Sequence, residues 1–301
     1  MHIDLPVTVA GLVVGILVGL TGMGGGALLT PLLVLVFRVS PLAAISSDLL
    51  TSLVMKPVGA AVHARRGTVN WTLVGWLSAG AVPAGFAGAV VIGMIGHGAG
   101  VTDPLKLIIG IALCAAVATT VFRQVMDRRA ARRAEPVDGA PPVRPVVTVL
   151  IGVVGGFAVG LTSVGAGSLI IAMLLVAYPG LRPSHLVGTD IMQAIPLVAA
   201  ATVGHLIFGD VQFALTASLL LGALPGVYLG ARLSAQGPVA VIRPVVTAVL
   251  LASALALLDV APGWIVVGTV GALVLTAGLS RTPRHVLPPV DDRAPEPAGR
   301  T

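Results

Sequence analysis

The sequence predicts an all-α polytopic membrane protein built from two repeats of inverted topology. Hydrophobic residues make up 56% of the 301 residues and charged residues only 10%, whereas a soluble domain carries about 25% charged residues. The apolar runs are long enough for many crossings at about 20 residues each. No run alternates strictly between polar and apolar residues, so we expect helices and not a transmembrane barrel.

A glycine-rich segment that occurs twice indicates the repeats. Residues 19–26 (GLTGMGGG) have a counterpart in residues 160–167 (GLTSVGAG). With one inserted residue the offset becomes 142, which aligns Asp48 with Asp190, His63 with His205 and Pro83 with Pro225. Two small-residue helices could share glycines by chance, but Asp, His and Pro at one offset indicate a duplication.

Apolar runs and their punctuation divide the chain into five parts. We expect a first transmembrane repeat over residues 1–122, a basic linker over 123–145, a second repeat over 146–258, an extra transmembrane helix over 259–279 and a disordered tail over 280–301. Each repeat begins with a glycine-broken helical hairpin and continues with three spanning helices. The extra helix has no counterpart in the first repeat.

The distribution of arginines predicts the hairpins. If each glycine-broken run crossed the membrane once, the arginines would lie on both sides. If each run turns back, one side holds Arg65, Arg66, the linker arginines, Arg182, Arg232, Arg243, Arg281 and Arg284. The other side then holds Asp4, Asp103, Asp210 and Asp259, with only Arg38 and Lys106. The positive-inside rule favours the second arrangement, which places the linker and the C-terminus in the cytoplasm and inverts the repeats.

The glycines fall into two classes. Those spaced by four are typical of a close-packing helix face and are Gly11, Gly15 and Gly19, and Gly152, Gly156 and Gly160. The denser clusters predict turns whose free N–H groups and following helix N-terminus attract an anion. The alternative is a water-lined turn without a ligand. The candidate substrate contacts are Thr21, Gly22, Gly24, Gly25, Gly26, Lys56, Thr162, Ser163, Gly165 and Gly167.

Four ionisable residues at equivalent positions are candidates for proton coupling. Asp48 and Asp190 lie near the start of a span, either as helix caps or as carboxyl groups turned toward a cavity. His63 and His205 lie near the end of the same spans, either as partners of the helix dipole or as protonation switches. Lys56 has no counterpart and could contact an anion or pair with Asp48.

Other classes of protein find little support. No metal-ligand spacing, nucleophile elbow, Walker loop or dinucleotide fingerprint occurs in a suitable context, so we expect no cofactor, no metal and no enzyme. The net charge of +6 is explained by arginines at membrane ends, so we expect no nucleic-acid partner. Cys114 is the single cysteine and can form no intrachain disulfide.

Several motifs together resemble a known family. They are residues 19–26, residues 63–71 (HARRGTVNW), their weaker echo at 205–213 (HLIFGDVQF) and residues 222–226 (GALPG). In this order they resemble the sulfite exporter TauE/SafE family of membrane permeases. The resemblance implies transport of sulfite, sulfoacetate or another small organosulfur anion, usually out of the cell. Asp48 and Asp190 depart from the commoner pattern, which has small hydroxyl residues there.

Together these observations predict a permease of the cytoplasmic membrane that moves a small anion, sulfite or an organosulfonate, by alternating access coupled to protons. The expected partners are the anion and the lipid bilayer. Whether the chain forms a homo-oligomer is left open at this point. The alternatives are an anion channel and an intramembrane enzyme that would use Asp48, Asp190, His63 and His205.

Overall fold

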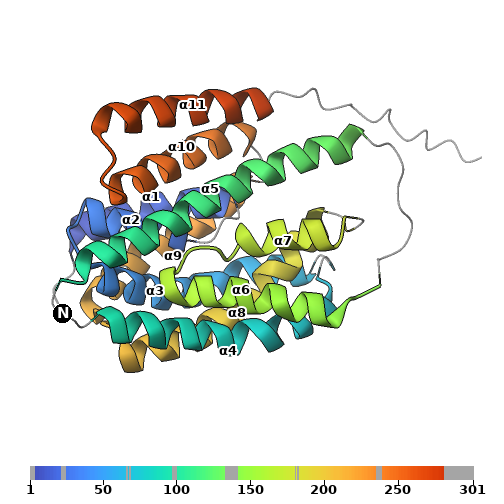
Figure 1. Cartoon of the computed structure of the whole chain (residues 1–301), viewed down its shortest axis with the longest axis horizontal. Coiled ribbons are helices and arrows are strands. Elements are labelled where there is room, and N and C mark those ends of the chain that lie inside the picture. Colours follow the sequence, from blue (N-terminus) through green and yellow to red (C-terminus); the bar gives the residue numbers. More distant parts are fainter. Residues whose placement is uncertain are drawn as a thin grey trace, which may run out of the picture.

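The computed structural model describes residues 4–21, 25–65, 67, 69–96, 100–132, 142–179, 181, 183–234 and 239–280. Within these residues the chain forms eleven α-helices and no strand (Figure 1). The helices are α1 (Leu5–Thr21), α2 (Gly26–Leu35), α3 (Pro41–Arg65), α4 (Trp71–Gly96), α5 (Thr102–Arg132), α6 (Pro145–Thr162), α7 (Leu169–Ala177), α8 (Pro183–Phe208), α9 (Phe213–Ser234), α10 (Val239–Leu257) and α11 (Pro262–Ser280).

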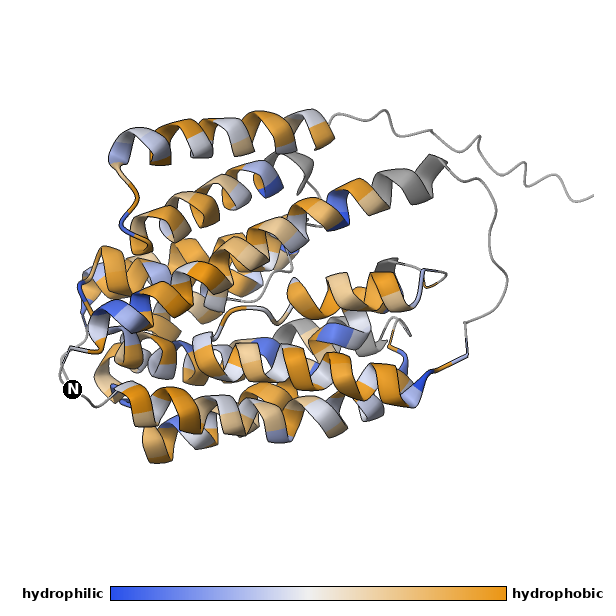
Figure 2. Cartoon of the chain, viewed as in Figure 1, coloured by the Kyte–Doolittle hydropathy of each residue, from blue (hydrophilic) through white to orange (hydrophobic). Residues whose placement is uncertain are grey.

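The predicted all-α membrane fold is confirmed. Six helices of the described chain are long and apolar enough to cross a membrane, and Figure 2 shows apolar residues along most of each helix. The order of elements is the same in both halves: two short helices around the glycines, α1 and α2 or α6 and α7, followed by three longer ones. Helix α11 follows as the extra element and packs on α10.

The second glycine-broken run is a hairpin. Figure 1 shows α6 and α7 running in opposite directions. Hydrogen bonds join the two helices at the end opposite the turn. The Tyr178 hydroxyl at the end of α7 accepts from the backbone N–H of Arg144 at 2.9 Å. The same hydroxyl lies 2.6 Å from Thr148 Oγ1 in the first turn of α6. The turn itself contains three residues with positive φ, Ser163 (59°), Gly165 (121°) and Gly167 (98°). This left-handed backbone lets the chain reverse within a few residues.

The two halves pack by exchanging partners. Helix α1 lies against α9, and its counterpart α6 lies against α4, while α3 pairs with α8 and α5 with α10. Two hydrogen bonds repeat this exchange in detail. The backbone N–H of Asn70 donates to Thr189 Oγ1 at 3.1 Å, and that of Gln212 donates to Ser47 Oγ at 3.2 Å. All four positions are related by the offset of 142. This is the pattern that a two-fold relation between halves produces, and their inversion across the membrane stays a prediction.

Glycines spaced by four bring the exchanged helices into backbone contact, as predicted for a packing face. A Cβ added at Gly15 of α1 would lie 2.5 Å from the carbonyl oxygen of Ala223 in α9. A Cβ added at Gly156 of α6 would lie 2.6 Å from the Cα of Ala81 in α4. In a bilayer such close approach supplies the dispersion contacts that hold helices together.

Helix α5 is longer than the predicted apolar run. We expected the linker to begin at residue 123, but α5 continues to Arg132. Residues 123–132 contain neither glycine nor proline and are rich in arginine, alanine and glutamine, which favour helix even where the segment is polar. Residues 133–141 of the linker and 281–301 of the tail lie outside the described part of the chain, and the remaining domain boundaries stay predictions.

A glycine-to-alanine pair tests the packing. We expect Gly156→Ala to lower the melting temperature in detergent, because the added methyl group meets the α4 backbone and overpacking costs about 1–3 kcal/mol. Gly75→Ala in α4, where nothing lies within 4 Å of the added Cβ, should leave stability unchanged or raise it by up to about 1 kcal/mol. Equal melting temperatures for the two variants would contradict the role of the glycine contact.

Candidate functional site

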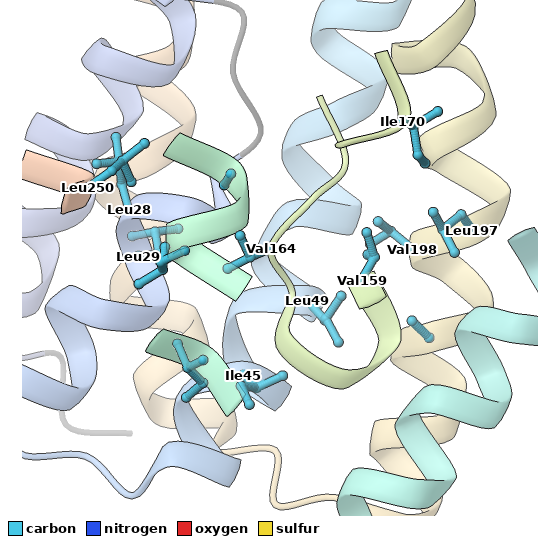
Figure 3. Packing of buried hydrophobic residues seen from close by; sticks show 14 of the residues in the cluster. Leu28, Leu29, Ile45, Leu49, Val159, Val164, Ile170, Leu197, Val198 and Leu250 are labelled. Atoms are coloured by element: carbon cyan, nitrogen blue, oxygen red, sulfur yellow. The ribbon is translucent and has the colours of Figure 1, made fainter. Parts of the chain in front are cut away.

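The start of α2 touches the turn of the second hairpin. Gly26, the first residue of α2, lies so close to Ser163 that an added Cβ would be 2.7 Å from Ser163 Oγ and closer still to its carbonyl oxygen. In Figure 3 the turn after α6 lies among buried side chains, with Leu29 of α2 on one side and Leu197 of α8 on the other. Gly22 and Gly24 lie outside the described residues. The structure thus brings Gly26 of one predicted cluster against Ser163 of the other.

The Ser163 hydroxyl is buried without a hydrogen-bond partner. The residue is 7% exposed, and no group of the described chain bonds its Oγ atom. The hydroxyl lies near the carboxyl group of Asp48, but outside ordinary hydrogen-bond geometry. A buried hydroxyl costs free energy when unpaired. Together with the N-terminus of α2 beside it, this hydroxyl is the clearest indication of a place for a polar ligand.

The two threonines predicted as substrate contacts bond to the backbone of their own helices. Thr21 Oγ1 donates to the carbonyl oxygen of Leu17 at 2.7 Å. Thr162 Oγ1 donates to Ala158 O at 2.7 Å and accepts from the backbone N–H of Val164 at 3.2 Å. These bonds shape the ends of α1 and α6 before the turns. A substrate contact of either threonine stays a prediction.

Asp48, in α3, is buried against α2 and the turn of the second hairpin. Its Oδ2 atom accepts a hydrogen bond from Thr30 Oγ1 of α2 at 2.7 Å, and its Oδ1 atom lies 3.4 Å from Ser52 Oγ. Because α3 begins at Pro41, Asp48 is seven residues inside the helix and is not a cap. The carboxyl group instead joins α3 to α2 near the hairpin tip.

Asp190 holds the equivalent position in α8, seven residues after Pro183, and is not a cap either. Its Oδ1 atom accepts from Gln193 Nε2 at 3.1 Å, and the backbone N–H of Gly167 lies close to the carboxyl group. The side-chain amide oxygen of Gln193, Oε1, is buried and has no hydrogen-bond partner in the described chain. Two buried carboxyl groups therefore lie near the turn of the second hairpin, Asp48 beside Ser163 and Asp190 beside Gly167.

Lys56, for which we expect either an anion contact or a pairing with Asp48, lies within electrostatic reach of both Asp190 and Asp48. The helical rise places Lys56 about 12 Å along α3 from Asp48, whereas the facing helix α8 brings Asp190 near it. No ion pair within 4.0 Å involves Lys56 in the described residues, where Lys106 and Asp103 form the one such pair. Lys56 therefore balances both carboxylates through space.

His205 is fully buried at the interface between halves. Its Nδ1 atom lies 2.8 Å from Ser46 Oγ of α3, and its Nε2 atom lies 2.9 Å from the carbonyl oxygen of Gly160. It is thus bonded to two other helices and is more than a partner of its own helix dipole. The side chain of His63 lies outside the described residues.

The described residues contain no group of three or more His, Cys, Asp or Glu side chains that could hold a metal ion. A groove of about 430 Å³ lies elsewhere, between α5, α6 and α7. It is lined only by Phe122, Val147, Ile151, Ala172, Met173, Val176 and Ala177. With no polar lining, this groove is not part of the candidate site.

Comparison with known proteins agrees with this architecture. A family model described as "Sulfite exporter TauE/SafE" matches residues 7–257. The chain belongs to this family. It is 36% identical over 262 residues to the "Probable membrane transporter protein YjnA" of Bacillus subtilis (strain 168), which covers 85% of this chain and 100% of that protein. It is 25% identical over 232 residues to "Probable membrane transporter protein YdhB" of the same organism, covering 76% and 89%. No solved structure matches the chain.

Membership of the TauE/SafE family makes the chain a multi-pass membrane transporter. The family assignment made from the motifs is therefore confirmed, while the roles of individual residues stay predictions. Residues that the motifs did not single out include Thr30, Ser46 and Ser52, which bond Asp48 or His205. Ser52 follows Asp48 by one helical turn, and that spacing could have indicated it. Thr30 and Ser46 meet their partners only through tertiary packing.

A double-mutant cycle tests the charge arrangement in this TauE/SafE protein. We expect Lys56→Met to lower the melting temperature, because two buried carboxylates lose their balancing charge. The coupling between Lys56→Met and Asp190→Asn should be roughly 0.5–3 kcal/mol and larger than that with Asp48→Asn. Thermal unfolding in detergent at one fixed pH measures all five variants. A larger coupling to Asp48 would contradict the arrangement.

Proposed function

We propose that this TauE/SafE protein is a secondary transporter that moves a small anion, sulfite or an organosulfonate, across the cytoplasmic membrane by alternating access coupled to protons. Family membership and the relatives' names support transport, and the choice of anion and of coupling ion is our proposal. The arginine-rich ends of the helices, with the linker and the C-terminus, face the cytoplasm in this proposal.

The meeting of the two hairpin tips carries the proposal. Gly26 begins α2, and the first N–H groups of a helix have no partner within it. The partial positive charge of that terminus favours an anion. Ser163 adds a buried hydroxyl that has no hydrogen-bond partner among the described residues, beside the same glycine. A tetrahedral or pyramidal oxyanion offers the several acceptor oxygens that such donors need.

The charges around the tips explain why protons would accompany the anion. Asp48, Asp190 and Lys56 together carry one net negative charge when all three are ionised. A monoanion entering this region is repelled unless a carboxyl group takes up a proton. Binding of the anion and binding of the proton therefore favour each other. Transport of both together is the simplest consequence.

The packing of the halves supplies a basis for alternating access. The partner exchange makes two rigid units of glycine-packed helices, α1 with α9 and α4 with α6. Helices α3 and α8, which carry Asp48 and Asp190, lie between the halves. Rocking of one unit against the other would expose the hairpin tips to each side in turn.

Removal of the Ser163 side chain tests anion binding at the tip. We expect Ser163→Gly to raise the KM for sulfite or methanesulfonate uptake into proteoliposomes about tenfold, the effect of one lost hydrogen bond to an anion. Glycine tolerates the φ of 59° at this position, so the turn is kept. Ser78→Ala removes another buried hydroxyl without a partner, on α4, and should leave the KM unchanged. Equal KM values in Ser163→Gly and wild type would remove the tip from the proposal.

A pH gradient tests the coupling. The wild-type protein should accumulate the anion on the alkaline side of the membrane, because the anion travels with a proton. Asp48→Asn and Asp190→Asn should lose this accumulation and retain exchange of labelled for unlabelled anion at equal pH, since amides cannot carry the proton. Accumulation at wild-type levels in both variants would contradict proton coupling through these carboxyl groups, and flux without saturation would indicate a channel.

A further inference from the structure

A buried histidine and a serine join three helices next to the second hairpin. His205 of α8 contacts Ser46 Oγ of α3 through Nδ1 and Gly160 O of α6 through Nε2. Gly209 closes over the pair, because an added Cβ there would lie 2.6 Å from Ser46 Oγ and 2.8 Å from Nδ1. Both residues have 0% exposure, so bulk water does not satisfy the ring nitrogens.

The Ser46 hydroxyl has two further contacts. It donates to the carbonyl oxygen of Leu42 at 2.8 Å, and it accepts from the backbone N–H of Asp210 at 3.2 Å. A hydroxyl carries one hydrogen and can accept two hydrogen bonds. Leu42 O can only accept, so in that contact the serine uses its one hydrogen. The N–H of Asp210 then takes one of the two acceptor positions of the hydroxyl, and Nδ1 lies at the other.

Counting donors then determines the protons on the ring. Gly160 O only accepts, so Nε2 must carry a hydrogen. With the serine hydrogen on Leu42 O, Nδ1 must carry a hydrogen as well. All four contacts are therefore made together only when His205 is an imidazolium with two N–H groups. A neutral ring keeps Nε2–H on Gly160 O and requires the serine hydroxyl to turn from Leu42 O to Nδ1.

We infer that Ser46, His205 and Gly160 O form a proton-binding site at the interface of the halves, in which Ser46 positions the proton on Nδ1. The two states of the site differ by one proton on the ring and by the rotation of the Ser46 hydroxyl. The site goes beyond the proposed anion transport, because it exists whether or not the chain carries an anion.

The surroundings of the ring leave the hydroxyl and the carbonyl as its direct partners. Helices α4 and α6 contain no ionisable side chain. On α3 the charged residues are Asp48, two positions after Ser46, Lys56 and, at the end of the helix, Arg65, with His63 just before it. The exposed Asp210 precedes α9. On α8 itself, Asp190 lies fifteen residues earlier, about 22 Å along the axis, and His185 lies earlier still.

The first half lacks this arrangement. The offset of 142 pairs Ser46 with Gly188, which has no hydroxyl. The counterpart of His205 is His63, so the duplication has kept both histidines but only one serine. The inferred proton site therefore occurs once, between Ser46 of the first half and His205 of the second.

Nitrogen NMR of the purified full-length protein with ¹⁵N-labelled histidine tests the inference. Loss of a signal in His205→Asn assigns the ring. We expect the wild-type ring to show two N–H groups at about pH 5 and to lose one as the pH rises toward about 8. Ser46→Ala should lower the ratio of doubly to singly protonated rings about tenfold at a given pH, because a charged N–H loses its acceptor.

Two control variants make the result specific. Ser47→Ala removes the neighbouring hydroxyl, which also accepts from a backbone N–H before α9 but does not touch the ring, and should leave the ratio unchanged. Ser46→Thr keeps the hydroxyl and should give the wild-type ratio of doubly to singly protonated rings. A wild-type ring with one proton throughout this pH range, or equal ratios in Ser46→Ala and Ser47→Ala, would overturn the inference. Melting temperatures confirm that each variant is folded, and no transport measurement enters the result.

Discussion

Backbone contact between glycine-lined helices is the constraint on which the rest of the structure depends. Lipid chains are as apolar as leucine, so burial alone gives transmembrane helices little reason to associate. The contacts of Gly15 with Ala223 and of Gly156 with Ala81 fix α1 on α9 and α6 on α4. Because α1 and α6 are also the first arms of the hairpins, the same contacts determine where the hairpin tips lie. The site is thus positioned by residues that have no functional groups.

The site combines features that are costly in a membrane. Buried carboxyl groups, a half-buried lysine and unpaired hydroxyl or amide atoms of the described chain lie within a few helical turns of one another. Uncompensated groups of this kind are retained where they bind something. Thr30 and Ser52 partly satisfy Asp48, whereas Ser163 is left without a partner. The cost is therefore concentrated at the contact between the hairpins, where a ligand would relieve it.

The sequence predicted the helix order, the second hairpin and the packing glycines because each has a signal that can be read along the chain. The spacing of Gly152, Gly156 and Gly160 is visible without any tertiary structure, and arginine positions report which ends lie together. Partners across helices leave no such signal. Asp190 reaches Lys56 only because α8 packs beside α3, and Ser46 meets His205 across 159 positions. The extension of α5 was missed because helix propensity, not hydropathy, governs residues 123–132.

The duplication has left the two halves unequal in chemistry. Ser46 corresponds to Gly188, and Lys56 corresponds to Val198. If the outward-open and inward-open forms arise when the halves exchange conformations, perfectly matched halves would make the two forms equal in free energy. Ser46 and Lys56 have no counterpart of the same type in the other half, and this difference removes the degeneracy. Under the proposed alternating access, one form would then be the resting form, and it would set from which side of the membrane the cycle begins.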